Sequence, residues 1–275
     1  MMRLSAFADE ISKDLTEQLD VLTSESIKFL ELRGVWGKNV SNFSDDEVQT
    51  IAEALRARGV GVSCIGSPIG KIGIKDDFEP HFEKFKRVME IAKALNTRYI
   101  RVFSFFIPEG EDPVTYRDEV MNRMQAMTEA AAAEGLILLH ENEKAIYGDT
   151  ADRCVDLLST VNSPHLRAIF DPANFVQVGL RPYEECWEKI KPYLEYLHIK
   201  DALLETRKVV PAGEGDGGLR QIVAELKAMG FEGFASLEPH LAAAGRMSGF
   251  SGPELFRVAA QAFKKLLAEA DLACS

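Results

Sequence analysis

Residues 136–142 read LILLHEN, a short aliphatic run that ends in His140, Glu141 and Asn142. Gly135 stands directly before this run, and a longer stretch of helical period follows it. An apolar run of roughly four to eight residues bounded by turn signals is typical of a buried β-strand, whereas ordinary helices are longer. The segment therefore predicts a buried strand with polar side chains at its C-terminal end.

The same pattern returns through the rest of the chain. Short apolar runs rich in β-branched or aromatic residues alternate with stretches of helical period, and this alternation predicts a parallel sheet. Eight units in 275 residues give about 34 residues for each unit, close to the repeat of a (β/α)8 barrel. The eight runs are RLSAF from Arg3, FLELR from Phe29, GVSCI from Gly61, YIRVF from Tyr99, LILLH from Leu136, RAIF from Arg167, YLHI from Tyr196 and FASL from Phe234.

An open, doubly wound sheet is the rival architecture, and the first turn discriminates between the two. The residues after RLSAF read ADEISKD and contain no GxGxxG motif, so the dinucleotide-binding fingerprint is absent. No Pro- or Gly-rich linker divides the chain. We therefore predict a fold of class α/β, a single (β/α)8 TIM barrel domain over residues 1–275.

Two residue pairs between the predicted strands have the spacing of a helix capping box: Ser44 with Glu47, and Ser251 with Glu254. Gly59 follows a helical stretch and precedes a strand, as a C-terminal helix cap does. These residues predict where the intervening helices begin and end.

Composition and charge limit the classes of partner. Apolar residues make up 46% of the chain and charged residues 27%, the balance of a globular enzyme. The formal net charge is -11 and no run of Lys or Arg offsets it, which disfavours nucleic acid as a partner. No apolar stretch approaches the ~18 residues of a transmembrane helix, so we expect no membrane association.

The cellular location is expected to be cytoplasmic. The first residues, MMRLSAFADE, lack the apolar region of a signal peptide. The four cysteines form no CxxC pair, so the sequence predicts neither a zinc knuckle nor a disulfide framework. They are Cys64, Cys154, Cys186 and Cys274.

Four successive predicted strands end in side chains that can bind a metal: Glu141, Asp171, His198 and Glu238. Taken singly, each has an ordinary explanation, because Asp171 before Pro172 fits a turn and His198 in an apolar run fits a packed histidine. Taken together they occupy equivalent positions, and a barrel brings the C-terminal ends of adjacent strands around one point. We therefore predict a shared cation site.

The predicted ligand set indicates a class of metal. Three carboxylates and one imidazole suit Mn²⁺, Mg²⁺, Co²⁺ or Zn²⁺ rather than thiophilic ions. Such a set leaves coordination positions for the carbonyl and hydroxyl oxygens of a substrate, so the metal would act as a Lewis acid and as a positioning device.

Five motifs carry a resemblance to a known family, and the resemblance covers essentially the whole chain. With them the chain resembles the sugar phosphate isomerase/epimerase group of the xylose isomerase-like TIM barrels, which includes tagatose-type epimerases and hydroxypyruvate isomerases. The resemblance implies that Glu141 and Glu238 are both metal ligands and the acid/base pair on opposite faces of the substrate carbon. The motifs are HEN with Glu141, FDPAN with Asp171, HIKDA with His198, PAGEGDGG from Pro211 and SLEPH with Glu238.

The chain departs from this family at Asn174, where several members carry a histidine. The departure leaves open whether Asn174 contacts substrate or a metal-bound water. Apurinic endonucleases of the same superfamily use extra histidines near the third and fourth strands, but here those strands end at Gly66 and Ser104. DNA repair is therefore disfavoured.

Four further side chains are predicted to contact the substrate: Lys200, Asn174, Glu31 and His240. Lys200 lies two residues after His198 and shares its side of an extended chain, although an ion pair with Asp201 or another acid is an alternative. For Glu31 the alternative is a buried salt bridge with Arg33 or Arg101, and for His240 it is capping of the next segment.

The GEGDGG loop invites a phosphate-binding interpretation, because glycine-rich turns at helix starts expose backbone N–H groups. Glu214 and Asp216 argue against it, so this loop gives no ground for assigning a phosphorylated substrate, and whether the substrate carries a phosphate stays open. The segment SFFIPEG from Ser104, together with Trp36, fits either the covering of a sugar or a contact between subunits of a homo-oligomer.

The leading prediction is a metal-dependent isomerase or epimerase of a small-molecule carbohydrate substrate, working through an enediolate. A lyase of the inosose dehydratase type shares the first step, since an enediolate can expel a β-hydroxyl group. A non-catalytic sugar-binding barrel and a metallohydrolase are weaker alternatives.

Overall fold

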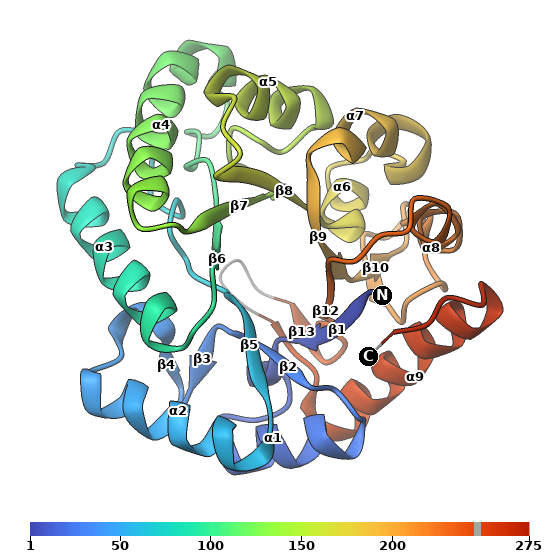
Figure 1. Ribbon diagram of the computed structural model, residues 1–275. Helices are drawn as coiled ribbons and strands as arrows, with labels where there is room; N and C mark the ends of the chain where they lie inside the picture. The colour runs from blue at the N-terminus through green and yellow to red at the C-terminus, as the bar shows by residue number, and fades with distance from the viewer. Residues whose placement is uncertain (245–248, 275) are drawn as a thin grey trace.

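The computed structural model of the protein describes residues 1–244 and 249–274. Eight parallel strands pair in one closed ring, in the order β1-β12-β9-β8-β7-β6-β5-β2 (Figure 1). Each run predicted from the sequence coincides with one of these strands to within two residues, so the predicted (β/α)8 barrel is confirmed. The strands are β1 (Arg3–Ala6), β2 (Phe29–Leu32), β5 (Gly61–Ile65), β6 (Tyr99–Val102), β7 (Ile137–Glu141), β8 (Leu166–Phe170), β9 (Leu194–Ile199) and β12 (Phe234–Leu237).

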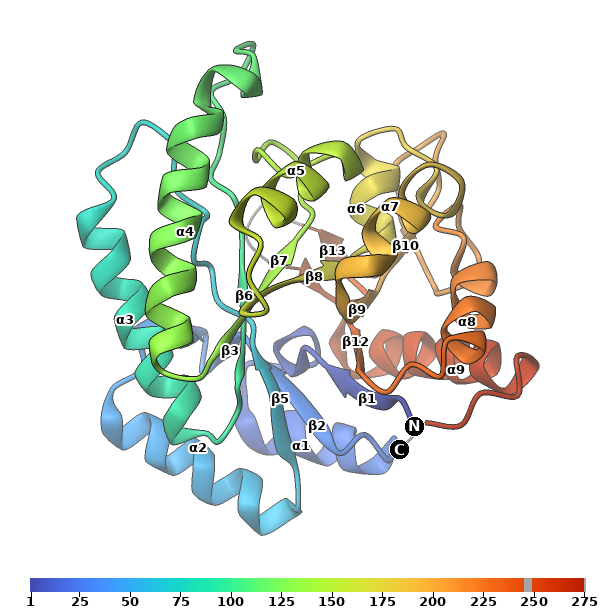
Figure 2. The same cartoon turned by 45° about the horizontal axis from the view of Figure 1, so that its top comes forward.

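Helices form an outer layer around the ring, as the two ribbon views show (Figures 1 and 2). They pack apolar side chains such as Phe85, Leu157 and Phe263, all fully buried, against the strands. The helices are α1 (Leu15–Ser24), α2 (Asp45–Arg58), α3 (Glu79–Ala94), α4 (Arg117–Ala133), α5 (Ala151–Val161), α6 (Pro172–Gln177), α7 (Glu188–Ile190), α8 (Leu219–Ala228) and α9 (Gly252–Glu269).

Three two-stranded hairpins follow barrel strands at their C-terminal ends. They are β3 (Gly34–Val35) with β4 (Lys38–Asn39), β10 (Asp201–Ala202) with β11 (Val209–Val210), and β13 (Ala243–Ala244) with β14 (Gly249–Phe250). Because they follow β2, β9 and β12, they elaborate the face of the barrel on which catalytic groups are found in this fold.

The barrel interior divides into an apolar layer and a charged layer. The apolar layer includes Tyr99, Tyr196 and Phe234, whose rings pack edge to face or tilted against one another. His198 lies two residues beyond Tyr196 in β9, so it points to the same side, one layer nearer the C-terminal ends. The aromatic layer therefore closes the barrel beneath the charged groups.

One of the two predicted capping boxes is confirmed and the other is wrong. The Ser44 side chain accepts the backbone N–H of Glu47, and the Glu47 carboxylate accepts the N–H of Ser44. Ser251 makes no such bond at the start of α9; its hydroxyl donates instead to Glu10 Oε2 at 2.9 Å. The reason is tertiary, because the loop after β1 brings a buried carboxylate to this serine.

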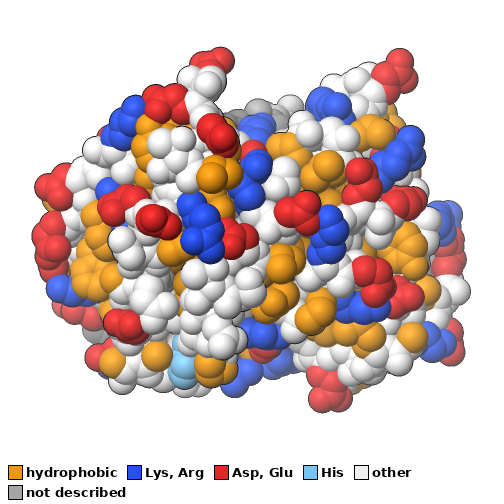
Figure 3. Space-filling model, turned by 90° about the horizontal axis from the view of Figure 1, so that it is seen from above, with side chains coloured by type: hydrophobic (Ala, Val, Ile, Leu, Met, Phe, Trp, Pro, Cys, Tyr) orange, Lys and Arg blue, Asp and Glu red, His pale blue; other side chains and the backbone are white. Residues whose placement is uncertain are grey.

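Among the described residues no helix is long and apolar enough to cross a membrane. On the face shown in Figure 3, acidic and basic side chains are interspersed, and no broad basic patch gathers there. The four cysteines are free thiols, as the sequence predicted.

A buried histidine outside the charged layer predicts a pH-dependent stability. The Nε2 atom of His81 accepts the backbone N–H of Gly70 at 2.7 Å, and burial, assisted by Lys84 and Arg123, lowers the His81 pKa from 6.5 to about 4. The neutral form is thus favoured in the fold, so its stabilising contribution is complete above pH 6.5 and is lost as pH falls towards 4.

We therefore expect the free energy of unfolding to fall less steeply between pH 6.5 and 4 in His81→Gln than in the wild type. Urea denaturation at several pH values measures this slope. Parallel curves for the two proteins would show that His81 contributes nothing to acid sensitivity.

Candidate metal centre

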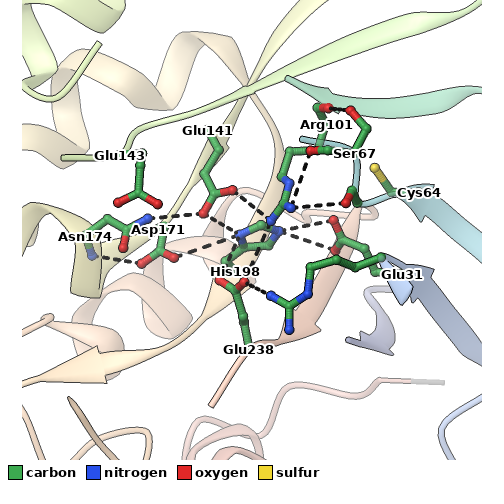
Figure 4. Close-up of polar contacts among 12 residues, drawn as sticks. Glu31, Cys64, Ser67, Arg101, Glu141, Glu143, Asp171, Asn174, His198 and Glu238 are labelled. Carbon is green, nitrogen blue, oxygen red and sulfur yellow. Dashed lines mark hydrogen bonds and ion pairs between the residues drawn. The ribbon is translucent and has the colours of Figure 1, made fainter. Parts of the chain in front are cut away.

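Four neighbouring strands bring the predicted ligands together. Glu141 is the last residue of β7, Asp171 follows β8 directly, His198 lies in β9 and Glu238 follows β12. One ligand atom of each residue lies within 4.8 Å of the others, and all four side chains are buried. The four residues predicted from strand ends therefore converge on one point (Figure 4).

Asp171 combines a structural contact with a place in this cluster. Its Oδ1 atom accepts the backbone N–H of Asn174 at 3.0 Å. Asp171 is therefore the N-cap of α6, which begins at Pro172. The side chain of Asn142 exchanges two hydrogen bonds of 2.9 Å with the Asp171 backbone, and so joins the ends of β7 and β8. Oδ1 of Asp171 is thus used in capping the helix, while Oδ2 faces the other predicted ligands.

The two ring nitrogens of His198 face different groups. Nδ1 lies 3.1 Å from Glu141 Oε1 and 3.8 Å from Glu238 Oε2, whereas Nε2 lies 3.3 Å from Glu31 Oε2 (Figure 4). Burial opposes protonation of the ring, but the Glu141 and Glu31 carboxylates outweigh it and raise the His198 pKa to about 10. Nδ1 is therefore the atom of His198 directed at the centre.

The buried atoms at the middle of the cluster fit a divalent cation. His198 Nδ1 makes no hydrogen bond of good geometry within residues 1–244 and 249–274, although it lies 3.1 Å from Glu141 Oε1. Asp171 Oδ2 lies 2.7 Å from the Lys200 ammonium, which balances part of its charge. Three carboxylates and one imidazole also form the hard donor set that Mn²⁺, Mg²⁺, Co²⁺ and Zn²⁺ accept.

Cationic side chains surround the ligand carboxylates. Arg101 Nη1 lies 3.1 Å from Glu141 Oε2, and Arg33 Nη1 lies 2.7 Å from Glu238 Oε1. Lys200 Nζ lies 2.7 Å from Asp171 Oδ2 and 2.9 Å from Glu238 Oε2. These charges stabilise a group of acids that would otherwise repel one another.

The pKa values of the three acids respond differently to this environment. Burial raises the pKa of Glu141, but His198 and Arg101 outweigh it and lower the pKa to about 2. Burial of Glu238 is likewise outweighed, chiefly by Lys200 and His240, so its pKa lies well below the ordinary value. For Asp171 burial outweighs Lys200 and raises the pKa to about 6. Glu141 and Glu238 are therefore ionised at neutral pH.

The four residues predicted to contact substrate all lie at this centre. Asn174 Nδ2 donates to Glu141 Oε1 at 3.1 Å, so it orients a ligand. His240 Nε2 lies 3.4 Å from Glu238 Oε1, and Lys200 pairs with Asp171 and Glu238 rather than with Asp201. Their contact with substrate stays a prediction.

Glu31 has a different partner from the one that the alternative interpretation proposed. Its carboxylate faces His198 Nε2 at 3.3 Å, while Arg33 pairs with Asp9, Glu10 and Glu238. Sequence reasoning considered Arg33 and Arg101 only as partners of Glu31 and missed their contacts with the ligands. The sequence did contain a signal for Arg101. Side chains alternate between the two sides of a strand, so Arg101 points to the same side as the inward-facing Tyr99 two residues before it.

The GEGDGG loop is built around a carboxylate of the protein itself. Asp201 accepts backbone N–H groups from Gly213 at 2.8 Å, Gly215 at 3.1 Å and Gly217 at 2.9 Å. A Cβ atom at Gly215 would lie 2.4 Å from Asp201 Oδ1, so the close approach requires glycine. The N–H groups that could hold a phosphate are already bound, which is a stronger reason against that interpretation than the acidic residues of the loop.

The contact between Glu31 and His198 leads to a prediction about metal affinity. A carboxylate on the far nitrogen of a ligating histidine sets the tautomer and raises the basicity of the ligating nitrogen. We expect Glu31→Gln to weaken Mn²⁺ binding by about 10- to 100-fold, measured by isothermal titration calorimetry. Glu143→Gln is the matched control, because Glu143 pairs with Lys71 instead. Equal affinities in both variants would contradict the role of Glu31.

Comparison with known proteins identifies relatives of this arrangement. A model of the xylose isomerase-like TIM barrel family matches residues 25–273. A 3-dehydroshikimate dehydratase of Bacillus anthracis is 23% identical over 170 residues, which cover 61% of this chain and 60% of that protein. The match thus spans less than two thirds of the relative.

Solved structures resemble the whole chain in fold. A D-tagatose 3-epimerase-like protein superposes with a TM-score of 0.78 at 16% identity, covering 98% of both chains. A xylose isomerase-like TIM barrel protein from Mycobacterium smegmatis, in complex with magnesium, has a TM-score of 0.71 at 17% identity and covers 98% of this chain and 97% of its own.

Proposed function

This chain belongs to the xylose isomerase-like TIM barrel family, and from that premise we propose that it is a metal-dependent isomerase or epimerase of a small sugar or sugar-like hydroxycarbonyl compound. The observation that carries the proposal is the convergence of Glu141, Asp171, His198 and Glu238 within 4.8 Å of one another. The carboxylate atoms nearest to His198 Nδ1 are Glu141 Oε1 at 3.1 Å, Asp171 Oδ2 at 3.9 Å and Glu238 Oε2 at 3.8 Å. A divalent cation held there supplies Lewis acidity that stabilises negative charge on a substrate oxygen.

Glu141 and Glu238 carry the proposed proton transfers. One ionised carboxylate removes a proton from the carbon next to the substrate carbonyl, and the electron pair of that C–H bond moves into an enediolate. Return of a proton to the opposite face of the same carbon gives an epimer, whereas return to the neighbouring carbon gives an aldose or ketose isomer. The lowered pKa values keep both carboxylates ionised at neutral pH, the form in which a carboxylate can accept a proton.

Lys200 and Asn174 position the reacting groups in this proposal. The Lys200 ammonium stays charged, because Asp171 and Glu238 outweigh burial and raise its pKa. From its place between these two carboxylates it can donate a hydrogen bond to a substrate oxygen. Asn174 holds Glu141 through Nδ2 and leaves Glu141 Oε2 to Arg101.

The experiment that tests the proposal is metal analysis of the purified protein, followed by incubation with a panel of ketoses and inososes in heavy water. We expect one bound divalent ion and deuterium at the carbon next to the carbonyl, in a product of unchanged molecular formula apart from the exchanged hydrogen. Failure of the protein to bind any divalent ion would overturn the proposal, as would metal-loaded protein that exchanges no substrate hydrogen across the panel.

A lyase is the second proposed function, favoured by the relative that is named a 3-dehydroshikimate dehydratase. The first proton transfer is the same, but the enediolate then expels a hydroxyl group from the β-carbon and leaves a carbon–carbon double bond. The same panel separates the two functions, because a lyase product is lighter by one water.

A further inference from the structure

A pocket of about 590 Å³ lies beside the metal centre. Segments that follow β1, β2, β5 and β12 line it, and these four strands are neighbours in the ring. The C-terminal ends of all barrel strands meet on one face, so the pocket lies on the face of the metal centre. Lys84 of α3 completes the outer wall.

The charge of this pocket is positive. Its cationic lining residues are Lys13, Arg33, Lys38 and Lys84, and its one acidic lining residue is Asp9. Asp9 is neutralised by Arg33 Nε at 2.7 Å, and Lys38 pairs with Glu47 outside the pocket. Across the described part of the chain, Lys13 and Lys84 have no acidic partner within 4 Å. Two uncompensated positive charges therefore share one pocket in a chain of net charge -11.

Arg33 connects the pocket to the reacting groups. It lines the pocket, yet it is 3% exposed, and its Nη1 atom donates to Glu238 Oε1 at 2.7 Å. Its guanidinium lies 4.6 Å from the ring centre of Phe7, which fixes its position. Arg33 therefore contacts both the pocket and the Glu238 carboxylate.

Polar groups in the pocket suit an oxygen-rich ligand. Asn39, Ser41 and Asn42 line it, and the Asn39 side-chain carbonyl accepts the backbone N–H of Ser41, which leaves the amide N–H₂ of Asn39 as a donor. The Lys13 and Lys84 ammonium groups are donors without acceptor capacity, and the Asn39 and Asn42 amides add N–H donors. This set matches a carboxylate or a phosphate, whose oxygens only accept.

We propose that this pocket receives an anionic group, a carboxylate or a phosphate monoester, of the substrate that reacts at the metal centre. The inference rests on the proposed function, because it specifies that the hydroxycarbonyl substrate of the proposed reaction carries an anionic group. The substrate places its carbonyl at the predicted metal ligands and its anionic group near Lys13 and Lys84, while Arg33 stays paired with Asp9, Glu10 and Glu238.

Calorimetric titration of inorganic phosphate and of glycolate into the protein tests this assignment, with metal and after chelation. In Lys13→Gln/Lys84→Gln we expect about five- to tenfold weaker binding of the preferred anion than in the wild type. The anion that binds more tightly identifies the group as phosphate or carboxylate. Anion binding that persists after chelation takes place in the pocket and not on the metal. The test of the pocket can therefore succeed or fail independently of the test of the proposed function.

Two double variants of equal charge change are the controls. Lys28→Gln/Lys86→Gln removes two lysines that do not line the pocket, and Lys144→Gln/Lys208→Gln removes two from a different pocket of about 380 Å³ beside His240. Both controls are expected to bind anions as the wild type does. The proposal is overturned if neither anion binds at tens of millimolar, if Lys13→Gln/Lys84→Gln binds as tightly as the wild type, or if the loss occurs in either control instead.

Discussion

Solvent exchange of the substrate hydrogen is expected to fall by about 10²- to 10⁴-fold in Glu141→Gln and in Glu238→Gln, the range of general acid–base catalysis. The amide cannot take up a proton, while it keeps the size of the carboxylate and one oxygen that can still face a cation. Arg101 and Arg33 would each lose a charged partner at 3.1 and 2.7 Å, so the variants also need a check of folding. Circular dichroism supplies that check.

The measurement is deuterium uptake in heavy water at saturating metal, so that weaker metal binding does not imitate lost proton transfer. Glu143→Gln provides the matched control, because this carboxylate lies two residues from Glu141 but pairs with Lys71 at 3.1 Å. It is expected to retain activity within about threefold. Full exchange in either Glu141→Gln or Glu238→Gln would remove that residue from the mechanism.

A loss of about 3–5 kcal/mol in the free energy of unfolding is expected for Asp201→Ala. The buried Asp201 carboxylate accepts backbone N–H groups of Ala202, Gly213, Gly215 and Gly217, and its removal leaves them without an acceptor. Each orphaned buried donor costs about 1–3 kcal/mol, and partial hydration of the loop reduces the total. Urea denaturation measures the difference.

Two further variants separate this effect from a general weakness of the loop. Asp201→Asn keeps one acceptor oxygen, so we expect it to be less destabilising than Asp201→Ala. Glu214→Ala removes an exposed acid from the same loop and is expected to change stability by less than about 0.5 kcal/mol. If Asp201→Ala is as stable as Glu214→Ala, the loop does not depend on this carboxylate.

The local pattern of apolar and polar residues was sufficient to predict the barrel and the cluster of Glu141, Asp171, His198 and Glu238. Each strand was recognisable as a short apolar run, and strand ends such as LLHEN and SLEPH carried side chains that can bind a metal. Parallel strands in a closed ring must bring their C-terminal ends together, so Glu141 and Glu238 converge although 97 positions separate them. No further information was needed to predict that these side chains meet.

The partners of charged groups could not be predicted in the same way. Arg33 was considered, with Arg101, as an alternative partner of Glu31, but it contacts Asp9, Glu10 and Glu238, and Glu31 faces His198. Arginine and glutamate side chains are long and have several rotamers, so a strand position specifies the side to which they point and not the group that they reach. Neighbouring strands and loops make that choice.

The sequence by itself determined the eight-stranded barrel, the four side chains that converge in the candidate metal centre and the family to which the chain belongs, because apolar periodicity and strand order act through the backbone. Only the tertiary structure decided that Ser251 bonds Glu10 instead of capping its helix, that Asp201 organises the glycine loop, and that Arg33 connects a basic pocket to Glu238. Those contacts join residues far apart in the chain, and their energies depend on burial and distance, which exist only after the chain has folded.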